Sequence, residues 1–311
     1  MKRFVLPLLC AAILFCTGCQ SKVQKGSTEG SEIFFTDALG QEIEIFQPKR
    51  VAALIGSFAD VWCLAGGKDT LVAAADDTWT SFEVELADEV VNLGAVKEPN
   101  LELLLAAEPD FIIASTNTEA DLALRDTFAR AGIPTAYFDI QTLDDYLNML
   151  EICTRLTGAP ENYVRYGVEV ADQCQTAIGR QDDSHPTVLT ARATGSSVKV
   201  KGSADFVLGE MLADLGCVNV ADGNGALLEN LTLEAILAAD PDYIFVVLQG
   251  ADPTRARETL EETLLSNPAW QSLRAVREGR FYTLSHRLYN LKPNARWGEA
   301  YEGLADILYG T

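Results

Sequence analysis

Aromatic and basic side chains occur in segments of this chain where neither a helical nor a strand period explains them. Trp79 and Phe58 lie in predicted loops of the first half, as do Ser57 and Lys97, and Gln249 follows a predicted strand of the second half. In or near the predicted loops of the second half lie six cations: Arg192, Lys199, Lys201, Arg287, Lys292 and Arg296. Large anionic chelates need flat aromatic surface and a few fixed cations. We therefore expect these loops to bind such a ligand, although each aromatic could instead pack under its loop and each cation could simply be solvated.

His286 and Tyr289 stand three positions apart in the segment SHRLYNLKPN, a spacing that could bring both side chains toward one ligand. A haem iron takes an axial His or Tyr. The alternative is a surface His beside a Tyr that packs under the loop. The sequence has two histidines, whereas sites for bare zinc or manganese are built from several His and carboxylate ligands. We therefore expect no site for a free metal ion and no cofactor of the protein's own.

A thirteen-residue stretch occurs twice. Leu101–Ile113 reads LELLLAAEPDFII and Leu233–Phe245 reads LEAILAADPDYIF, with eight identical positions. Each copy predicts a short helix with a Glu in its first turn, Glu102 or Glu234, where the helix dipole favours an anion. Pro-Asp then ends the helix, and the aromatic and β-branched run that follows predicts a buried parallel strand. Because the copies lie too far apart for a solenoid repeat, they indicate two similar α/β lobes.

The elements around the candidate residues alternate between strands and helices, which implies parallel sheets whose ligands bind beyond the carboxyl ends of the strands. Residues 32–45 predict a β-hairpin with DALG as its turn. A helical pattern runs from Leu143 to about Ile178, interrupted at Gly158-Ala159-Pro160, and predicts a long helix between the lobes. A closing helix is expected at about 295–308.

The N-terminus predicts export. Met1–Arg3 is basic, and Phe4–Phe15 is an uncharged apolar run too short to span a bilayer comfortably, which is typical of a secretory signal. The small residues before Cys19 resemble a bacterial lipoprotein cleavage box. We therefore predict a signal peptide over residues 1–18, lipidation of Cys19, and a flexible tether over residues 19–31. A plain signal peptide or an uncleaved anchor is the alternative.

Charge and cysteine usage narrow the function further. The formal net charge is −21 and the pI is near 4.4, which argues against binding nucleic acid through a general positive field. Four cysteines follow the leader: Cys63, Cys153, Cys174 and Cys217. None forms a CxxC pair and each has apolar neighbours, so buried free thiols are expected, with a Cys153–Cys174 bridge as the alternative.

Taken together, these features of the chain resemble those of a known family. The hairpin and first strand FFTDALGQEIEI-FQPKRVAAL, the copy NLELLLAAEPDFIIAS, the long helical stretch and the second copy NLTLEAILAADPDYIFV look like a substrate-binding protein of an ABC importer. The type is the one that serves ferric siderophores, haem and cobalamin. The resemblance covers roughly Glu32 to Tyr309.

The resemblance implies a fold and a set of partners. The fold would be α/β, with two Rossmann-like lobes of parallel sheet over residues 32–145 and 183–311, joined by a single long helix over residues 146–182. The protein would be an extracytoplasmic monomer, anchored to the cell membrane by lipid, that captures a metal chelate between its lobes. Ferric siderophore is our first choice of ligand, then a corrinoid, then haem. Glu102 and Glu234 match the surface Glu that each lobe of this family presents to arginines of the permease, which works with an ATPase; simple helix-dipole charges are the alternative.

Other classes of function find less support in the sequence. It contains no GxSxG, HExxH, phosphate-loop or glycine-rich dinucleotide motif, so we do not expect an enzyme. A tetrapyrrole chelatase, which also has two α/β lobes, is the best enzymatic alternative. A surface adhesin or sensor on the same scaffold is a third possibility, but it would give the paired Glu residues no role.

Overall fold

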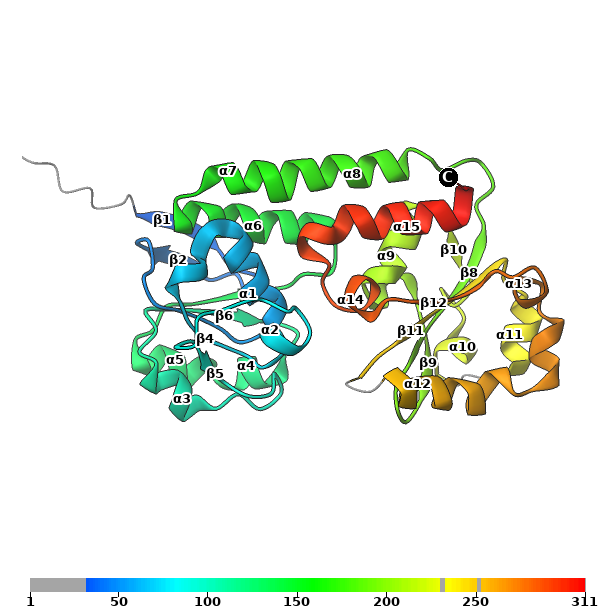
Figure 1. The fold of residues 1–311 in the computed structure, drawn as a ribbon, viewed down its shortest axis with the longest axis horizontal. Coiled ribbons are helices and arrows are strands. Elements are labelled where there is room, and N and C mark those ends of the chain that lie inside the picture. Colours follow the sequence, from blue (N-terminus) through cyan, green and yellow to red (C-terminus); the bar gives the residue numbers. More distant parts are fainter. Residues whose placement is uncertain (1–31, 230–232, 251–252, 311) are drawn as a thin grey trace, which may run out of the picture. The chain divides into compact units, whose positions relative to one another are not determined.

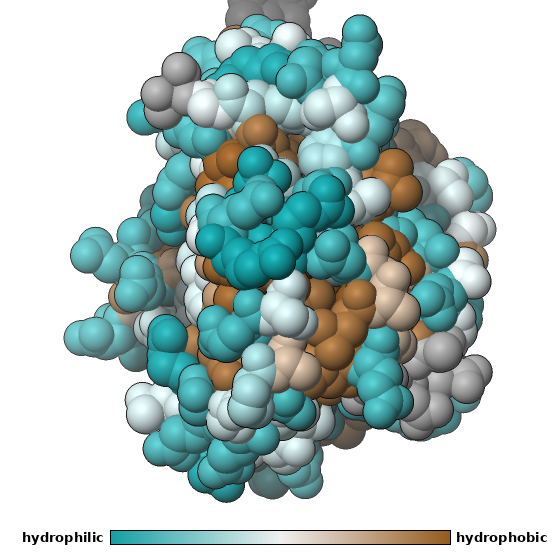
Figure 2. Space-filling view, turned by 90° about the vertical axis from the view of Figure 1, so that its right-hand side faces the viewer, coloured by the Kyte–Doolittle hydropathy of each residue, from teal (hydrophilic) through white to brown (hydrophobic). Residues whose placement is uncertain are grey.

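The computed structural model of the chain describes residues 32–229, 233–250 and 253–310. The predicted signal peptide, the tether and Cys19 lie outside these residues. In the described part no helix is long and apolar enough to cross a membrane. The face seen in Figure 2 is mostly hydrophilic, with smaller apolar areas between the polar ones, as expected for a chain with a net charge of −21.

The fold begins with the predicted hairpin. Strand β1 (Ile33–Thr36) pairs antiparallel with β2 (Glu42–Ile45). One carboxylate oxygen of Asp37 accepts hydrogen bonds of 2.9 Å from the backbone amides of Leu39 and Gln41. An Asp that bonds backbone amides further along the chain closes a tight turn, which explains why DALG connects the two strands.

The N-terminal lobe (Figure 1) is built on a five-stranded sheet. The strand order is β5-β4-β3-β6-β7, and every neighbouring pair is parallel. All residues of the central strands are buried, because helices cover both faces of such a sheet. The strands are β3 (Val51–Ala53), β4 (Leu71–Ala74), β5 (Val91–Asn92), β6 (Phe111–Ser115) and β7 (Thr135–Phe138). The main helices are α1 (Gly56–Trp62), α2 (Asp77–Thr80), α3 (Leu101–Ala106), α4 (Glu119–Ala123) and α5 (Arg125–Ala131).

Two helical stretches, not one, lead to the second lobe. Helix α6 (Leu143–Thr157) begins with a capping box at Thr142 and ends at Gly158, whose φ of 75° is left-handed. The chain then resumes with α7 (Pro160–Tyr163) and continues through the π-helical turn η3 (Val164–Val168) into α8 (Glu169–Ile178). The prediction of a single helix over residues 146–182 is therefore wrong: a glycine cap followed by Pro160 divides it.

The C-terminal lobe repeats the parallel sheet with one addition. Strands β10-β8-β11-β12 are parallel, and β9 (Val198–Lys201) pairs antiparallel with β8 (Thr187–Ala193). The other strands are β10 (Val218–Asn219), β11 (Tyr243–Leu248) and β12 (Phe281–Leu284). The helices that follow β9 are α9 (Val207–Asp214), α10 (Gly225–Glu229), α11 (Leu233–Ala239), α12 (Pro253–Leu260), α13 (Arg274–Arg277), α14 (His286–Tyr289) and α15 (Trp297–Tyr309), with the shorter turns η4 (Ser203–Asp205), η5 (Glu261–Leu265), η6 (Pro268–Ser272) and η7 (Asn294–Arg296) between them. The N-terminal lobe has two such turns between α1 and β4, η1 (Cys63–Gly67) and η2 (Lys68–Thr70).

One core joins the two lobes. The closing helix α15 lies beside α8 (Figure 1), and buried apolar side chains of α6, α8, α15 and one face of each sheet form a contiguous cluster. That cluster contains Phe138 from the first sheet and Phe245 from the second. The opposite face of each sheet has its own smaller cluster. The two-lobed α/β fold with parallel sheets is as predicted.

Candidate functional site

The strand order marks the edge of each sheet where a ligand is expected. In the N-terminal lobe the chain moves outward in one direction from β3 and in the other from β6, and in the C-terminal lobe it does so from β8 and β11. Open α/β sheets bind ligands beyond the carboxyl ends of the strands at such switch points. The candidate site therefore comprises the residues that follow β3 and β6 in one lobe and β8 and β11 in the other.

The residues that follow β3 pack into the core, so the predictions for two ligand-contacting residues, Ser57 and Phe58, are wrong. Helix α1 starts at Gly56 against the next loop: a Cβ on Gly56 would lie 2.6 Å from the backbone nitrogen of Thr78. This close approach directs Phe58 into the core, where it is fully buried and meets Phe138 edge-on with 6.2 Å between ring centroids. Ser57 is also buried. The prediction that Phe58 and Ser57 lie in a ligand-facing loop is wrong, because α1 packs on the sheet.

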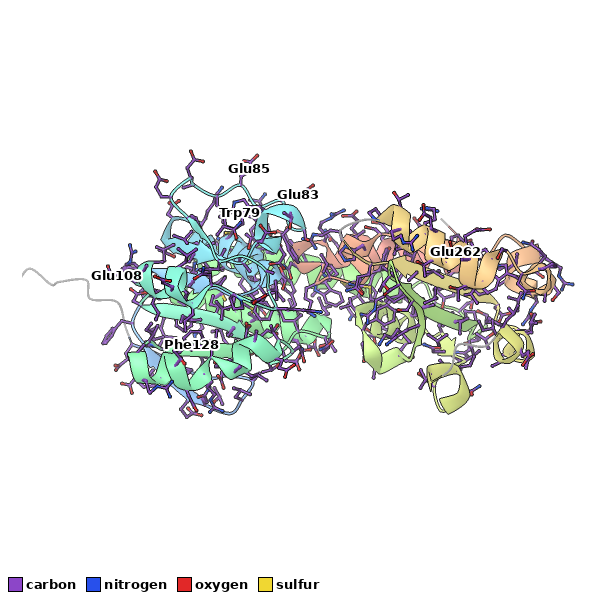
Figure 3. All side chains as sticks on the ribbon, turned by 90° about the horizontal axis from the view of Figure 1, so that it is seen from below. Trp79, Glu83, Glu85, Glu108, Phe128 and Glu262 are labelled. Atoms are coloured by element: carbon purple, nitrogen blue, oxygen red, sulfur yellow. The ribbon has the colours of Figure 1, made fainter. Side chains whose placement is uncertain are left out.

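Trp79 differs from the other tryptophans of the chain. It lies in α2, is partly buried against the core, and keeps part of its ring exposed, whereas Trp62, Trp270 and Trp297 are almost fully buried. In Figure 3, Trp79 lies on the N-terminal lobe, in the same part of the lobe as Glu83. A half-exposed indole is well suited to stack on a flat ligand. Trp79 lies on a helix rather than in a loop, but it remains the aromatic candidate.

Two carboxylates behind this edge, the half-buried Asp77 and the buried Asp121, were missed by the sequence analysis. Asp77 accepts a 2.8 Å bond from the Gly56 amide, and Asp121 accepts a 2.8 Å bond from the Ser115 amide. Burial raises the pKa of Asp77 to about 6, and burial together with the charge of Asp77 raises the pKa of Asp121 to about 7. Neither stands in a recognisable motif, because the groups that bury them come from other strands.

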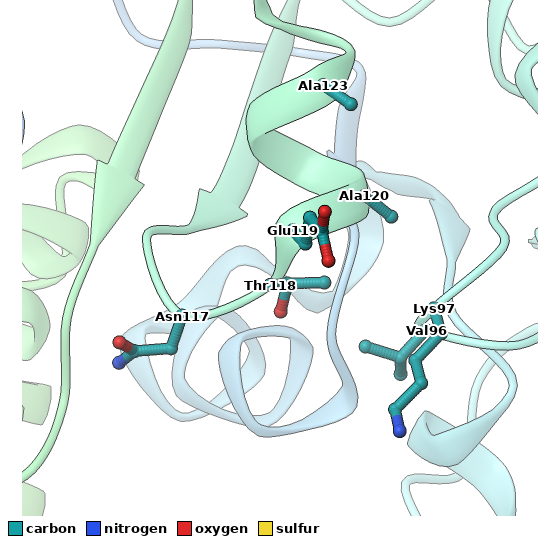
Figure 4. A pocket seen from close by; sticks show the side chains of 7 residues that line it. All are labelled: Val96, Lys97, Asn117, Thr118, Glu119, Ala120 and Ala123. Carbon is teal, nitrogen blue, oxygen red and sulfur yellow. The ribbon is translucent and has the colours of Figure 1, made fainter.

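A pocket of about 530 Å³ opens at the same edge of the N-terminal lobe (Figure 4). It lies between the loop after β5, which carries Lys97, and the start of α4, where Asn117 and Thr118 follow β6. Lys97 is exposed, so its ammonium can meet an anionic group. The lining residues are Val96, Lys97, Asn117, Thr118, Glu119, Ala120 and Ala123. The structure thus brings the predicted loop of Lys97 together with the residues that follow β6.

Three of the predicted cations lie together in the C-terminal lobe. Arg192 of β8 is directly opposite Lys199 of β9, and Thr190 is opposite Lys201. Because opposite residues and alternate residues share a face, the three cations lie on one face of the strand pair. The alternate positions, such as Ala191 and Val200, point into the core of the other face. The prediction that these cations lie in a loop is wrong, because Arg192 belongs to β8 and Lys199 and Lys201 belong to β9.

These three cations are free of ionic partners. Among the residues that the structure describes, no ion pair involves Arg192, Lys199 or Lys201. Gln249 follows directly after the neighbouring strand β11, is half-buried, and donates its backbone amide to the carbonyl of Ala193 at 2.7 Å. The carboxyl end of the second sheet therefore presents a cationic face next to an amide side chain. We call Arg192, Lys199 and Lys201 the cation triad.

Arg287 has a different environment from the triad. Its Nη2 lies 3.5 Å from a carboxylate oxygen of Asp60, its Nη1 donates to the carbonyl of Lys292 at 2.8 Å, and its guanidinium lies 4.2 Å from the ring centre of Phe82. Arg296 is paired with Glu299 at 2.6 Å. Arg287 and Arg296 were predicted near an anionic ligand, and each already has a carboxylate partner, so their charges are less available to such a ligand than those of the triad.

His286 and Tyr289 do not form a shared site. Tyr289 is buried and donates its hydroxyl to the carbonyl of Ala300 at 3.1 Å, so it packs under the segment as the alternative interpretation had it. His286 is half-buried, and burial together with the charge of Arg287 lowers its pKa. Burial also lowers the pKa of the half-buried Lys292. Within the described ranges no group of three or more His, Cys, Asp or Glu residues could hold a metal ion.

The paired Glu residues occupy equivalent exposed positions. Glu102 lies in the first turn of α3, whose start is capped by the Asn100 side chain accepting from the Leu103 amide at 3.0 Å. Glu234 lies in the first turn of α11. Neither has an ion-pair partner in the part of the chain that the structure covers. Both carboxylates are therefore available to a partner protein.

The cysteines that follow the leader are free thiols, as expected. Cys153 and Cys174 are buried, and Cys63 and Cys217 are half-buried. Burial raises the pKa of Cys174 to about 12, with a smaller contribution from Asp214, and burial raises the pKa of Cys217 to the same value. Thiols that hold their protons this firmly are poor nucleophiles, which fits a packing role.

Comparison with known proteins identifies the family. A family model described as periplasmic binding protein matches residues 51–288. The chain is 24% identical to the Fe(3+)-citrate-binding protein YfmC of Bacillus subtilis, over 89% of this chain and 86% of that one, and 24% identical to the iron-uptake system-binding protein of the same organism, over 97% and 95%. The solved structure of the periplasmic heme-binding protein RhuT from Roseiflexus sp. RS-1 has a TM-score of 0.67 at 22% identity and covers 84% of this chain and 98% of its own.

These matches extend across both lobes and therefore include the carboxyl ends of both parallel sheets. The family is one of solute-binding proteins rather than enzymes, which favours binding over the chelatase-like alternative. The family model matches most of the chain, and the chain therefore belongs to the periplasmic binding protein family.

Proposed function

We propose that this protein is the extracytoplasmic solute-binding component of an ABC importer and that its ligand is an anionic metal chelate. A ferric siderophore is the first choice, and a corrinoid or haem comes next. The observation that carries the proposal is the cation triad, Arg192, Lys199 and Lys201, which lies on one face at the carboxyl end of the second sheet and forms no ion pair among the residues that the structure describes. The names of the relatives, which bind ferric citrate or serve iron uptake, support the same class of ligand.

The charge distribution gives the triad its significance. In a chain of net charge −21, the triad places three cations side by side on one face of a strand pair. Mutual repulsion on one strand pair costs stability unless an anion relieves it. A chelate that carries carboxylate or catecholate oxygens would do so through charge-assisted hydrogen bonds. At the edge of the first sheet, Lys97 in the pocket offers one further cation, and the partly exposed Trp79 offers a flat apolar surface.

The partner and the location follow from the same proposal. Glu102 and Glu234, exposed at equivalent positions of the two lobes, would meet arginines of the permease, while the ATPase acts from the other side of the membrane. Lipidation of Cys19 would keep the protein at the membrane surface. Replacing Cys19 by Ser should then release the protein in folded form, because the acyl chains supply the membrane affinity, at about 0.8 kcal/mol for each buried CH₂.

A fluorescence titration tests the ligand class. The protein would be titrated with ferric citrate, a ferric catecholate, a ferric hydroxamate, cobalamin and haemin. Trp79 is the tryptophan that is not almost fully buried, so its emission should respond most to a ligand at the site. A Trp79→Phe variant assigns the signal: it should lose most of the quenching. If none of these chelates binds at micromolar concentration, the proposed ligand class is wrong.

A further inference from the structure

A polar cluster connects helix α1 to the segment between β12 and α15. A carboxylate oxygen of Asp60 accepts a 2.8 Å bond from the side-chain amide of Asn294 and lies 3.5 Å from Arg287. The same amide of Asn294 donates to the carbonyl of Ser57 at 2.8 Å. Ser57 and Asp60 belong to the N-terminal lobe, and Arg287 and Asn294 follow the last strand of the C-terminal lobe. These bonds therefore join the two lobes directly, outside the connecting helices.

The cluster is shielded from solvent. The side chains of Arg287 and Asp60 are 21% and 19% exposed, whereas those of Arg296 and Glu299, a pair in the same region, are 47% and 53% exposed. The ring of Phe82 lies against the guanidinium of Arg287. Partly buried pairs are screened by salt much less than exposed ones. The Arg287–Asp60 contact should therefore persist at salt concentrations that weaken the Arg296–Glu299 pair.

Asn294 is held through both its backbone and its side chain. It is fully buried, and its φ of 56° lies in the left-handed region. Asparagine is one of the few residues other than glycine that adopt this conformation readily. Its position after Pro293 turns the chain toward α15, while its amide reaches α1. A substitution by glycine would keep the turn and remove both hydrogen bonds.

We propose that Asp60, Arg287 and Asn294 form an interlobe clamp that fixes the segment Ser285–Arg296 against α1. Arg287 is thus a positioning residue, because it holds the segment that carries His286 and Lys292 at the carboxyl end of β12. Its own charge interacts with the carboxylate of Asp60. The clamp is a property of the ligand-free protein. Its value for ligand capture rests on the proposed function, because a fixed segment lowers the cost of ordering the site on binding.

Hydrogen–deuterium exchange on the intact, ligand-free protein tests the clamp. In Arg287→Gln and Asn294→Gly, amides of both α1 and the segment Ser285–Arg296 should exchange at least tenfold faster, because local opening would no longer break the interlobe bonds. Asp60→Asn keeps the acceptor for Asn294 but not the charge, so it should give an intermediate increase. Arg287→Lys keeps a cation and should restore part of the protection.

The matched control lies within the same segment. Arg296→Gln removes the exposed pair with Glu299 and should leave exchange in α1 unchanged. The proposal is overturned if α1 exchanges at the wild-type rate in both Arg287→Gln and Asn294→Gly, or if Arg296→Gln accelerates it equally. Since no ligand is present, this outcome is independent of whether the titration finds a chelate that binds.

Discussion

The two copies of the repeated stretch build the same corner in the two lobes. In each copy the residue before Pro has a positive φ, 46° at Glu108 and 37° at Asp240. In each, the Asp after Pro accepts backbone bonds at the start of the neighbouring strand: Asp110 bonds the amides of Lys49 and Arg50 at 2.9 Å, and Asp242 bonds that of Thr187 at 2.8 Å.

An arginine completes each corner by donating to a carbonyl at the end of the repeat helix. Arg50 donates to Glu108 and Arg274 to Asp240, each at 2.9 Å. The corner thus fixes the helix that carries Glu102 or Glu234 relative to the central strand.

The two lobes share these corners but differ at the sheet edges where the ligand is expected to bind. The N-terminal edge holds the half-buried Asp77 and the buried Asp121 behind its loops. The C-terminal edge holds the cation triad on β8 and β9, and the antiparallel strand β9 has no counterpart in the first sheet. The repeated part therefore builds the same corner in both lobes and carries the two proposed docking carboxylates, and the proposed ligand contacts lie in the parts that are not repeated.

The largest effect should come from removing both docking carboxylates. Glu102→Ala combined with Glu234→Ala should abolish uptake of the chelate by cells, because each charge-assisted contact with the permease is worth about 1.5–3 kcal/mol. Ligand affinity should stay within about twofold of the wild-type value. The single variants, compared in the same uptake assay, show whether the lobes contribute equally. Normal uptake by the double variant, or a large loss of affinity, would show that these residues have another role.

The corners should differ in strength although they share a geometry. Asp242 accepts bonds from the amide and the hydroxyl of Thr187 and pairs with Arg274 at 2.9 Å, whereas the exposed Asp110 accepts from backbone amides. We expect Asp242→Ala to lower the free energy of unfolding by about 3 kcal/mol and Asp110→Ala by about 1.5 kcal/mol. Urea denaturation of both variants measures this, and equal losses would mean that the Arg274 pair adds nothing.

Ligand binding should respond differently to the two edges. Trp79→Ala should weaken binding of the chelate at least tenfold, about 1.4 kcal/mol, at any salt concentration, because it removes apolar contact. Arg192→Gln should weaken binding by a similar factor at low salt and by less at high salt. Lys97→Gln removes a cation from the N-terminal pocket and serves as the matched control for Arg192→Gln. Titrations at two salt concentrations that show no difference between Trp79→Ala and Arg192→Gln would place the ligand elsewhere.

The pH dependence of stability should have opposite signs in the two lobes. The folded pKa of Asp121, about 7, lies above its usual value of 3.8, so the folded protein binds the extra proton and stability falls as pH rises between these values. For Asp242, burial is outweighed by the bonds from Thr187 and the charges of Arg274 and Arg280, and its pKa is lowered. Its contribution is present above the unfolded pKa and is lost as pH falls through the folded one.

Asparagine variants separate these two contributions. Asp121→Asn should be more stable than wild type at pH 8 by at least about 1.4 kcal/mol, the equivalent of one pKa unit, and similar to it near pH 4. Asp242→Asn should lose stability at pH 8 instead. Denaturation curves at both pH values decide, and an Asp121→Asn variant that is no more stable at pH 8 would contradict the burial argument.

The sequence by itself determined the local elements and their order. The hairpin turn at Asp37, the helix start at Leu143 and its interruption at Gly158, and the helix and strand of both repeats are set by short-range propensities, and the structure has them where the pattern placed them. The family resemblance and the exposure of Glu102 and Glu234 also followed from residue patterns, because a Glu in the first turn of an amphipathic helix faces solvent.

Tertiary structure alone decided which candidate side chains are free to bind. Arg287 and Asp60 lie 227 positions apart in the chain, and no local pattern shows that they pair. Phe58 is buried because the backbone at Asp77 and Thr78 presses α1 onto the sheet, and the cation triad forms because β9 folds back on β8. A charge or an aromatic ring becomes a binding group only if no long-range partner takes it up, and long-range partners are chosen by packing and burial, which are properties of the folded chain.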